Sequence, residues 1–325
     1  MARARMKPVY VGVDVGGTKI LAGVFDTSLR LLGALKVKTR SQEGARAVLD
    51  RIEHAVRGVV TAQGLRMADV RAVGMGLPGV VREGKVMCAS NLGWANLPIE
   101  ERMRDRLRRP VFADNDCNLF TLGVHAVEFQ GKPRHLLGVF LGTGIGGGII
   151  IDGKLHVGFT QGAGEFGLLI LDRARPKTGF GIRGSFETLA SRQGILWRLR
   201  REIARGAKTV LTADSGRTLK GVRSRQLRQA WNRRDGLVRR VVRETAGDVG
   251  LAVASLISAF GPQYVVLGGG VIEALKGAML PIIRRTAAAH VLPGTMKGVR
   301  IVTSRLGDSG GITGAAVLAR SRLPA

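Results

Sequence analysis

Cysteine, aromatic and acidic residues are all scarce in this 325-residue sequence. Its two cysteines, Cys88 and Cys117, provide no disulfide framework, which indicates a reducing compartment. No apolar run is long enough to cross a bilayer: the stretch 136–151 is interrupted by glycines, and no apolar leader precedes the first predicted strand. We therefore predict a cytoplasmic protein without a signal peptide or a membrane partner.

The shortage of acids leaves 24 Asp and Glu against 51 Lys and Arg, a formal net charge of +27. Such a field attracts anionic partners, including nucleotides, polyphosphate and nucleic acid. A compositional bias toward arginine would produce the same excess. Its densest part, 198–243, contains a single aromatic residue, Trp231, and no nucleic-acid-binding signature, so we predict no specific nucleic-acid partner.

Glycine, by contrast, is abundant, and it clusters first in the stretch 9–26, VYVGVDVGGTKILAGVFD. Alternating β-branched residues on either side of the glycines predict a hairpin. Its tip, Gly16 to Lys19, offers backbone amides, a hydroxyl and a lysine that can hold an anion. Asp14 lies two residues before the tip, where a carboxylate can hold a hydrated Mg²⁺. A Gly-Gly tip that only turns the chain is the alternative.

The second half of the chain repeats this plan. A predicted strand at 136–141 runs into a glycine-rich turn at 142–148 and then a short strand at 149–151. The turn lacks the Walker spacing and leads into a strand, so neither a Walker loop nor a Rossmann fingerprint applies. Two hairpin tips facing each other across an interdomain cleft would hold a nucleotide's phosphates from both sides.

Polar residues follow the predicted strand at 111–113. In an open α/β sheet ligands bind at the carboxyl ends of strands, which makes Asn115 and Asp116 site candidates. Asp116 can act as general base toward a hydroxyl, or serve only to cap the next helix. Farther on, Glu165 lies among glycines, and a buried strand at 264–267 ends in a Gly-Gly-Gly turn suited to a flat adenosine.

These segments together resemble the ROK family of sugar kinases and sugar-responsive repressors, over nearly the whole chain. DVGGTK at 14–19 and LGTGIGGG at 141–148 are similar to the family's two phosphate motifs, and VLGGGV at 266–271 to its adenosine motif. The resemblance implies a donor site made of Asp14, Gly16, Gly17, Thr18, Lys19, Gly142, Thr143, Gly144, Gly146, Gly268, Gly269 and Gly270.

The resemblance also implies how the acceptor is bound. Asp116 would be the base that deprotonates a sugar hydroxyl, and Asn115 would hold the sugar. Glu165, Glu187 and, more weakly, Asn91 would hydrogen-bond other hydroxyls. The implied reaction is transfer of a phosphoryl group from ATP, with Mg²⁺, to a hexose, most simply to the 6-hydroxyl of glucose.

The implied fold is α/β, the two-domain actin-like ATPase (ribonuclease H-like) fold with an interdomain active-site cleft. We expect an N-terminal domain at 1–125, a C-terminal domain at 126–309, and a last helix at 310–323 that packs back onto the first domain. Family members are commonly homodimers or homotetramers, so the same is expected here.

The sequence departs from the family at its zinc site. The histidine of the family's G-E-x-G-H segment is Leu168, and its three zinc cysteines correspond to Thr178, Phe180 and Ser185. These side chains cannot replace thiolate and imidazole ligands. We therefore expect no structural zinc and a loop held by packing around Phe180 and Phe186; stoichiometric zinc in the purified protein would contradict this.

Losing that histidine leaves the substrate open. The alternatives are a polyphosphate-dependent glucokinase, a kinase for fructose, N-acetylmannosamine or N-acetylglucosamine, and a weakly catalytic protein that binds sugar. A repressor would need a helix-turn-helix before the kinase-like body, and only a few residues precede the first predicted strand.

Overall fold

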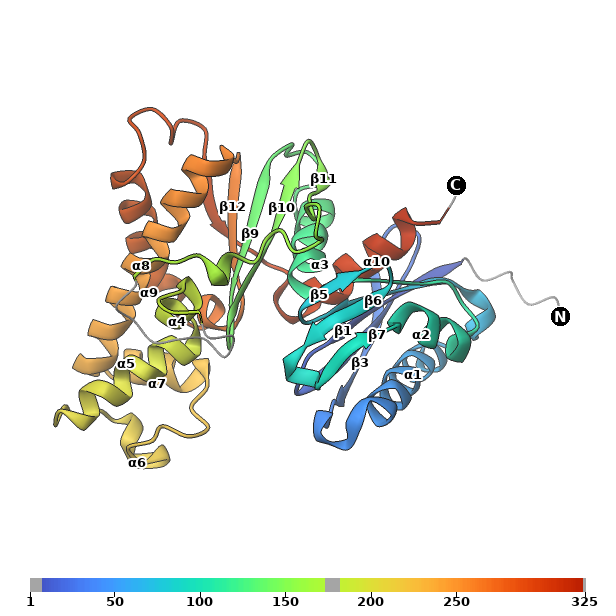
Figure 1. Ribbon diagram of the computed structural model, residues 1–325, viewed down its shortest axis with the longest axis horizontal. Helices are drawn as coiled ribbons and strands as arrows, with labels where there is room; N and C mark the ends of the chain where they lie inside the picture. Colours follow the sequence, from blue (N-terminus) through green and yellow to red (C-terminus); the bar gives the residue numbers. More distant parts are fainter. Residues whose placement is uncertain (1–7, 173–181, 324–325) are drawn as a thin grey trace. The chain divides into compact units, whose positions relative to one another are not determined.

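A computed structural model describes residues 8–172 and 182–323 of the chain. The chain divides into two compact units (Figure 1). Unit 1 comprises residues 1–134, 148–163 and 308–325, and unit 2 comprises residues 135–147 and 164–307. In the part that the structure describes, no helix is both long and apolar enough to span a membrane.

Unit 1 is built on a five-stranded sheet. Its strands are β1 (Val9–Val15), β2 (Lys19–Phe25), β3 (Leu31–Lys38), β4 (Val70–Leu77) and β8 (Val111–Asn115), in the order β3-β2-β1-β4-β8. The first three strands pair antiparallel, and β4 and β8 continue the sheet in parallel with β1. The helices of this unit are α1 (Gly44–Ala62), α2 (Ile99–Leu107), α3 (Asp116–Gly123), which continues as a π-helix at Val124–Glu128, and α10 (Gly310–Ser321).

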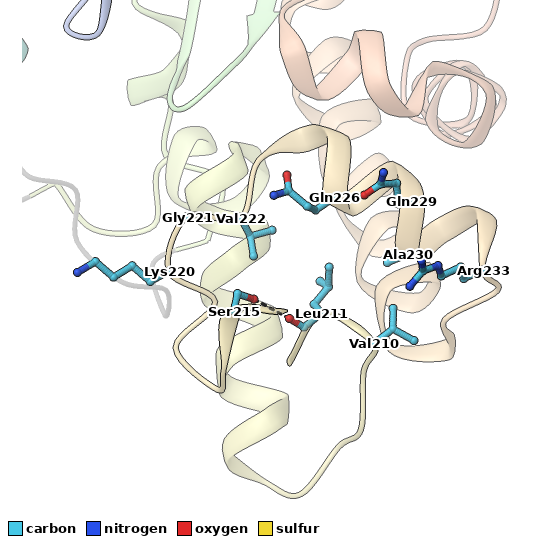
Figure 2. Close-up of a pocket in the computed structure, with 10 residues that line it drawn as sticks. All are labelled: Val210, Leu211, Ser215, Lys220, Gly221, Val222, Gln226, Gln229, Ala230 and Arg233. Atoms are coloured by element: carbon cyan, nitrogen blue, oxygen red, sulfur yellow. Dashed lines mark hydrogen bonds between the residues drawn. The ribbon is translucent and has the colours of Figure 1, made fainter. Parts of the chain in front are cut away.

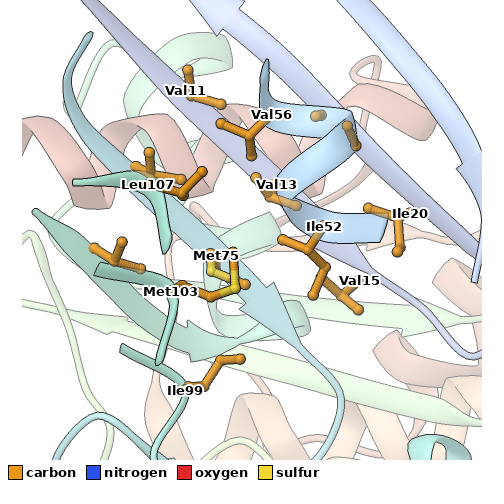
Figure 3. Close-up of a cluster of buried hydrophobic side chains, with 14 of the residues drawn as sticks. Val11, Val13, Val15, Ile20, Ile52, Val56, Met75, Ile99, Met103 and Leu107 are labelled. Atoms are coloured by element: carbon orange, nitrogen blue, oxygen red, sulfur yellow. The ribbon is translucent and has the colours of Figure 1, made fainter. Parts of the chain in front are cut away.

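The alternation that predicts β1 assigns its two faces. Val9, Val11, Val13 and Val15 point to one side, where they form a large buried cluster with residues of β2, β4, α1 and α2 (Figure 3). Tyr10 points to the other side and packs with residues of α10. Helices thus cover both faces of this mixed sheet, including its parallel strands β1, β4 and β8.

On the second face, α10 lies directly against the backbone of the sheet. A Cβ on Gly12 of β1 would overlap the carbonyl oxygen of Ile312, and one on Gly74 of β4 would overlap that of Ala315. Gly314 contacts Leu119 of α3 in the same way. These glycines let α10 approach both β1 and α3, so the last helix is an integral part of unit 1.

A small three-stranded antiparallel sheet, in the order β5-β6-β7, lies in the same unit. Its strands are β5 (Val80–Arg82), β6 (Lys85–Ala89) and β7 (Trp94–Leu97). Short 3-10 turns at Ser41–Glu43, Met67–Asp69 and Ser90–Leu92 connect elements of unit 1. The turn at Ser90–Leu92 carries Asn91.

The second five-stranded sheet has strands β9 (Leu136–Leu141), β10 (Ile145–Ile151), β11 (Lys154–Leu155), β12 (Tyr264–Gly268) and β13 (Arg300–Thr303), in the order β11-β10-β9-β12-β13. Strands β9, β12 and β13, all in unit 2, pair in parallel. The helices of unit 2 are α4 (Phe186–Ala190), α5 (Arg192–Ala204), α6 (Leu211–Ser215), α7 (Ser224–Asn232), α8 (Gly236–Phe260) and α9 (Gly270–Ala289). Helices α8 and α9 pack against each other, closely enough that a Cβ on Gly250 would lie 2.5 Å from Cβ of Thr286.

Two elements differ from the pattern expected of the sequence. Strand β10 begins at Ile145, inside the glycine-rich stretch. Glycine is required within this strand because a side chain on Gly147 would overlap the ring of Phe166. Helix α9 begins at Gly270, inside the Gly-Gly-Gly turn that the sequence predicts after residue 267, and it contains Pro281. Glycine and proline concealed the first turns of this helix.

Candidate active site

Hydrogen bonds from neighbouring residues fix the shape of the hairpin tip at Gly16 and Gly17. The backbone of Gly16 donates to the carbonyl of Lys19 (2.9 Å), closing the turn. Thr39, a fully buried residue just after β3, donates its hydroxyl to the carbonyl of Gly16 (2.6 Å). A Cβ on Gly17 would lie 3.2 Å from the carbonyl oxygen of Asn91, so the structure brings Asn91 beside the tip. The tip is therefore a braced turn of fixed shape.

Asp14 lies near the end of β1, half-buried beside the start of α10. A Cβ on Gly311 would lie 3.0 Å from the Asp14 carboxyl carbon, so glycine is needed at that position. Burial, and then the negative charge of Asp116, raise the pKa of Asp14 to about 7; the charge of Lys19 acts in the opposite direction. The structure thus places two carboxylates from distant parts of the chain in one electrostatic site.

Asp116 is the first residue of α3, and Asn115 is the cap of that helix. The side chain of Asn115 accepts from the backbone of Cys117 (2.8 Å) and Asn118 (3.1 Å), and its amide donates to the carbonyl of Gly79 (3.0 Å). Asn115 is therefore the N-cap of α3, and Asp116 shares with it the backbone N–H of Cys117. Burial raises the pKa of Asp116, while the hydrogen bond from Cys117 lowers it.

Lys19, the cation of the tip, pairs with Asp308 just before α10 (Nζ–Oδ2 2.8 Å). This hydrogen bond lowers the pKa of Asp308. The pair connects the hairpin to the last helix, and it keeps the lysine ammonium at the edge of the tip.

In unit 2, the glycine-rich turn after β9 is closed by a hydrogen bond from Gly142 to the carbonyl of Gly144 (2.8 Å). Glu187 of α4 accepts from the backbone of Ile145 (2.9 Å), and its carboxyl occupies the space that a side chain on Gly144 would need. Arg192 of α5 donates to the hydroxyl of Thr143 (2.7 Å). A carboxylate predicted to bind sugar therefore also holds the turn predicted to bind phosphate.

The Gly268–Gly270 turn follows β12 and leads into α9 with Gly269 at the cap, in a left-handed conformation (φ 84°). A Cβ on Gly269 would lie 2.5 Å from the carbonyl oxygen of Leu141, at the end of β9. The turns at Gly268–Gly270 and Gly142–Gly144 are thus adjacent within unit 2. Ser224, the first residue of α7, faces Gly270, since a Cβ there would lie 3.7 Å from its hydroxyl.

Glu165 is exposed, and it precedes a 3-10 turn at Phe166–Leu168 that includes the half-buried Leu168. Ser185 caps α4, and Phe186 is fully buried. The positions of Thr178 and Phe180 lie outside the described residues, so the packing expected of Phe180 stays a prediction.

A pocket of about 110 Å³ lies elsewhere in unit 2, between α6, α7 and the loop at 220–222 (Figure 2). Lys220 and Arg233 are its charged lining residues, and Gln226 and Gln229 contribute amides. None of the residues that the motifs single out lines it, so the pocket is separate from the candidate site.

Within unit 1 the structure brings together Asp14, Asn91, Asn115, Asp116 and the tip. Within unit 2 it groups Glu187 with the turns at 142–144 and 268–270. Thr39, Asp308 and Arg192 also contact these groups, and the sequence alone did not single them out. The one sequence signal for such contacts is the Gly310-Gly311 pair, which indicates that the start of α10 approaches another element.

The sheet order of unit 1, the parallel strands β9, β12 and β13 of unit 2 and the two glycine-rich turns define a protein of the actin-like ATPase fold. The sequence profile of the ROK family matches residues 10–322, and the chain belongs to the ROK family.

Individual relatives match along nearly their whole lengths. A glucokinase of Halalkalibacterium halodurans is 29% identical over 320 residues, which cover 96% of this chain and 95% of that enzyme. A ROK family glucokinase from Streptomyces griseus, in complex with glucose and AMPPNP, superposes with a TM-score of 0.83 at 31% identity, covering 96% and 99% of the two chains. A ROK hexokinase from Thermus thermophilus gives a TM-score of 0.74 at 32% identity, with 96% and 97% covered.

Proposed function

We propose that this chain is a sugar kinase that transfers a phosphoryl group from ATP to glucose, at the 6-hydroxyl. The observation that carries the proposal is the carboxylate pair of Asp14 and Asp116 beside a braced glycine tip. The glucokinase relatives, one of them in complex with glucose and AMPPNP, support the choice of substrates.

Asp116 is the proposed general base. Because burial raises the pKa of its carboxylate, it accepts a hydroxyl proton more readily than an exposed aspartate would. The hydrogen bond from Cys117 to Oδ1 keeps one carboxylate oxygen oriented, and the N-terminus of α3 stabilises its negative charge. Asn91, Asn115, Glu165 and Glu187 are the proposed hydroxyl contacts.

Asp14 fits a magnesium ion. It is held next to a second carboxylate, and this like-charge repulsion would be relieved by a cation. Among the residues described, no three carboxylate, imidazole or thiol groups gather to form a complete metal site, which suits an ion held by one or two carboxylates together with substrate phosphates. When bound, Mg²⁺ would neutralise charge on the phosphates of the donor.

The chain's own groups then divide the work. Within unit 2, we assign the backbone amides of the turn at Gly142–Gly144 to the donor phosphates and the turn at Gly268–Gly270 to adenosine. The braced tip of unit 1 is the other proposed phosphate-binding turn. Because such groups act by position and charge, few reactive side chains are needed.

A coupled assay with ATP over a panel of hexoses tests the proposal, and turnover with glucose is expected. Asp116→Asn should lower kcat by about 10²–10⁴ while glucose still binds, because the amide keeps the shape but cannot accept the proton. Asp105→Asn, on the exposed face of α2, is the matched control. Turnover by Asp116→Asn at the wild-type rate would remove Asp116 from its role, and no turnover with any hexose would refute the kinase.

A further inference from the structure

Two arginines of unit 2, Arg192 and Arg223, have no role in the proposed phosphoryl transfer described above. Arg192 begins α5 and is attached to the glycine-rich turn of unit 2 twice: its backbone donates to the carbonyl of Gly142 (3.0 Å), and its guanidinium donates to the hydroxyl of Thr143 (2.7 Å). Arg223 is the exposed cap residue of α7.

Arg192 is poorly satisfied where it lies. Its Nε is buried and has no hydrogen-bond partner among the residues that the structure describes, which is costly for a charged donor. Its pKa is lowered by burial and then by the positive charge of Arg223, so the two guanidinium groups repel each other. Within 8–172 and 182–323, no carboxylate forms an ion pair with either arginine.

A second unpaired polar group lies next to Arg223. Within the described part of the chain, the hydroxyl of Ser224 is buried without a partner, and this residue is only 8% exposed. Ser224 faces Gly270 in the turn after β12. The polar side chains therefore extend from the phosphate turn at Gly142–Gly144 to the adenosine turn at Gly268–Gly270, all within unit 2.

Repulsion between two cations and an unused buried donor are both relieved by one kind of ligand, an anion with several oxygens. Guanidinium groups bind phosphate oxygens through paired N–H donors, which gives them both charge and direction. An ordinary structural role for Arg192, bracing Thr143, accounts for one of its N–H groups but not for Nε or for Arg223.

We propose that Arg192 and Arg223 bind the phosphate chain of the phosphoryl donor alongside the turn at Gly142–Gly144. This inference rests on the proposed function and extends it by naming the side chains that hold the donor. A nucleoside triphosphate and inorganic polyphosphate share the chemistry that the pair recognises. Ser224 lies where it would contact the nucleoside only in the first case.

Titration calorimetry with ATP, with tripolyphosphate and with glucose tests the pair directly. Arg223→Gln and Arg192→Gln should each weaken the binding of the phosphate chain about tenfold, the effect of losing one charged hydrogen bond, and leave glucose affinity unchanged. Arg192→Lys, which keeps the charge, should recover part of the loss. Arg228→Gln, an exposed change on the same helix α7, is the matched control and should bind as wild type.

The arms of the experiment separate the two donors. Parallel losses for ATP and tripolyphosphate mean that the site reads the chain of phosphates, whereas binding of ATP alone, weakened further by Ser224→Ala, means a nucleotide site. Wild-type affinity in both Arg192→Gln and Arg223→Gln overturns the inference. So does a loss confined to Arg192→Gln that lysine does not restore, because it would mark a structural brace.

Failure of the proposed function looks different. A wild-type chain that binds ATP through these arginines but phosphorylates no hexose would refute the kinase and keep the inference. A wild-type chain that binds neither phosphate compound would overturn the inference.

Discussion

Asp14, the proposed magnesium ligand, also lowers the stability of the folded protein. Its carboxyl is kept beside that of Asp116, and burial and this repulsion raise its pKa from 3.8 to about 7. The folded state therefore holds a proton that the unfolded chain releases near pH 4. Protonated Asp14 therefore favours the folded state at low pH, and this stabilisation is lost as the pH rises toward 7. The ionised carboxylate of Asp14 thus lowers the free energy of unfolding at neutral pH.

Asp14→Asn should therefore raise the stability of the apo protein at pH 8, by an amount on the order of 2–4 kcal/mol, and the gain should shrink as the pH falls from 7 to 4. Thermal melting across this pH range measures it, with Asp105→Asn as control. Mg²⁺ should reduce the difference in stability between Asp14→Asn and wild type at pH 8, because it stabilises wild type alone. A gain that stays the same at pH 4 and pH 8 would mean that the carboxyl of Asp14 is not the cause.

Glu187 is a second residue with two functions. It accepts from Ile145 at the phosphate turn, and it is the proposed contact of a sugar hydroxyl. If Glu187 binds sugar as proposed, sugar binding would act directly on the shape of the turn at Gly142–Gly144, because the same carboxylate holds that turn.

At the scale of elements, Gly142 and Gly144 of the glycine-rich turn after β9 differ in what surrounds them. A side chain on Gly144 would overlap Glu187, whereas a Cβ on Gly142 would meet nothing closer than 3.9 Å. A methyl group added at Gly142 should therefore affect ligand binding without disturbing the fold.

Gly142→Ala should leave the melting temperature near that of wild type and raise the KM for the phosphoryl donor about tenfold or more, the usual effect of one misplaced methyl group in a tight site. Steady-state kinetics with each substrate varied in turn measures it, and the KM for glucose should stay unchanged. An effect limited to glucose would contradict the phosphate assignment of this turn.

The last helix, α10, depends on glycine in another way. Because a Cβ on Gly314 would overlap the carbonyl oxygen of Leu119, Gly314→Ala should push α10 away from α3 and destabilise unit 1 by about 3 kcal/mol. Gly277→Ala, in α9 with open space around it, should instead add about 0.5–1 kcal/mol through helix propensity. Thermal melting of both variants decides between close packing and propensity; equal effects would exclude the packing argument.

At the scale of the whole molecule, the net charge of +27 is the dominant feature. Repulsion among so many like charges destabilises the compact state, and salt screens it. Raising NaCl from 10 to 150 mM should therefore increase the melting temperature by about 2–5 °C. Choline chloride at equal ionic strength should have the same effect, since screening depends on ionic strength. A melting temperature that falls with salt would show that attractive ion pairs dominate.

The sequence by itself determined the strands, most helices, the glycine-rich turns and the ROK family. These follow from local patterns: alternation in β1, helical spacing in α1, and motifs such as DVGGTK, each contained within a short stretch of chain. The zinc-free loop, the sugar contacts and the domain limits remain predictions from the same patterns.

Only the tertiary structure decided what these residues do to one another. It showed that Asn115 rather than Asp116 caps α3, that Asp116 raises the pKa of Asp14, and that Glu187 and Arg192 reach the turn after β9. It also extended β10 and α9 into stretches where glycine and proline weaken the pattern. The physical reason is range: periodicity and turn chemistry act over a few residues, whereas burial, charge coupling and close approach depend on segments that the chain brings together only when it is packed.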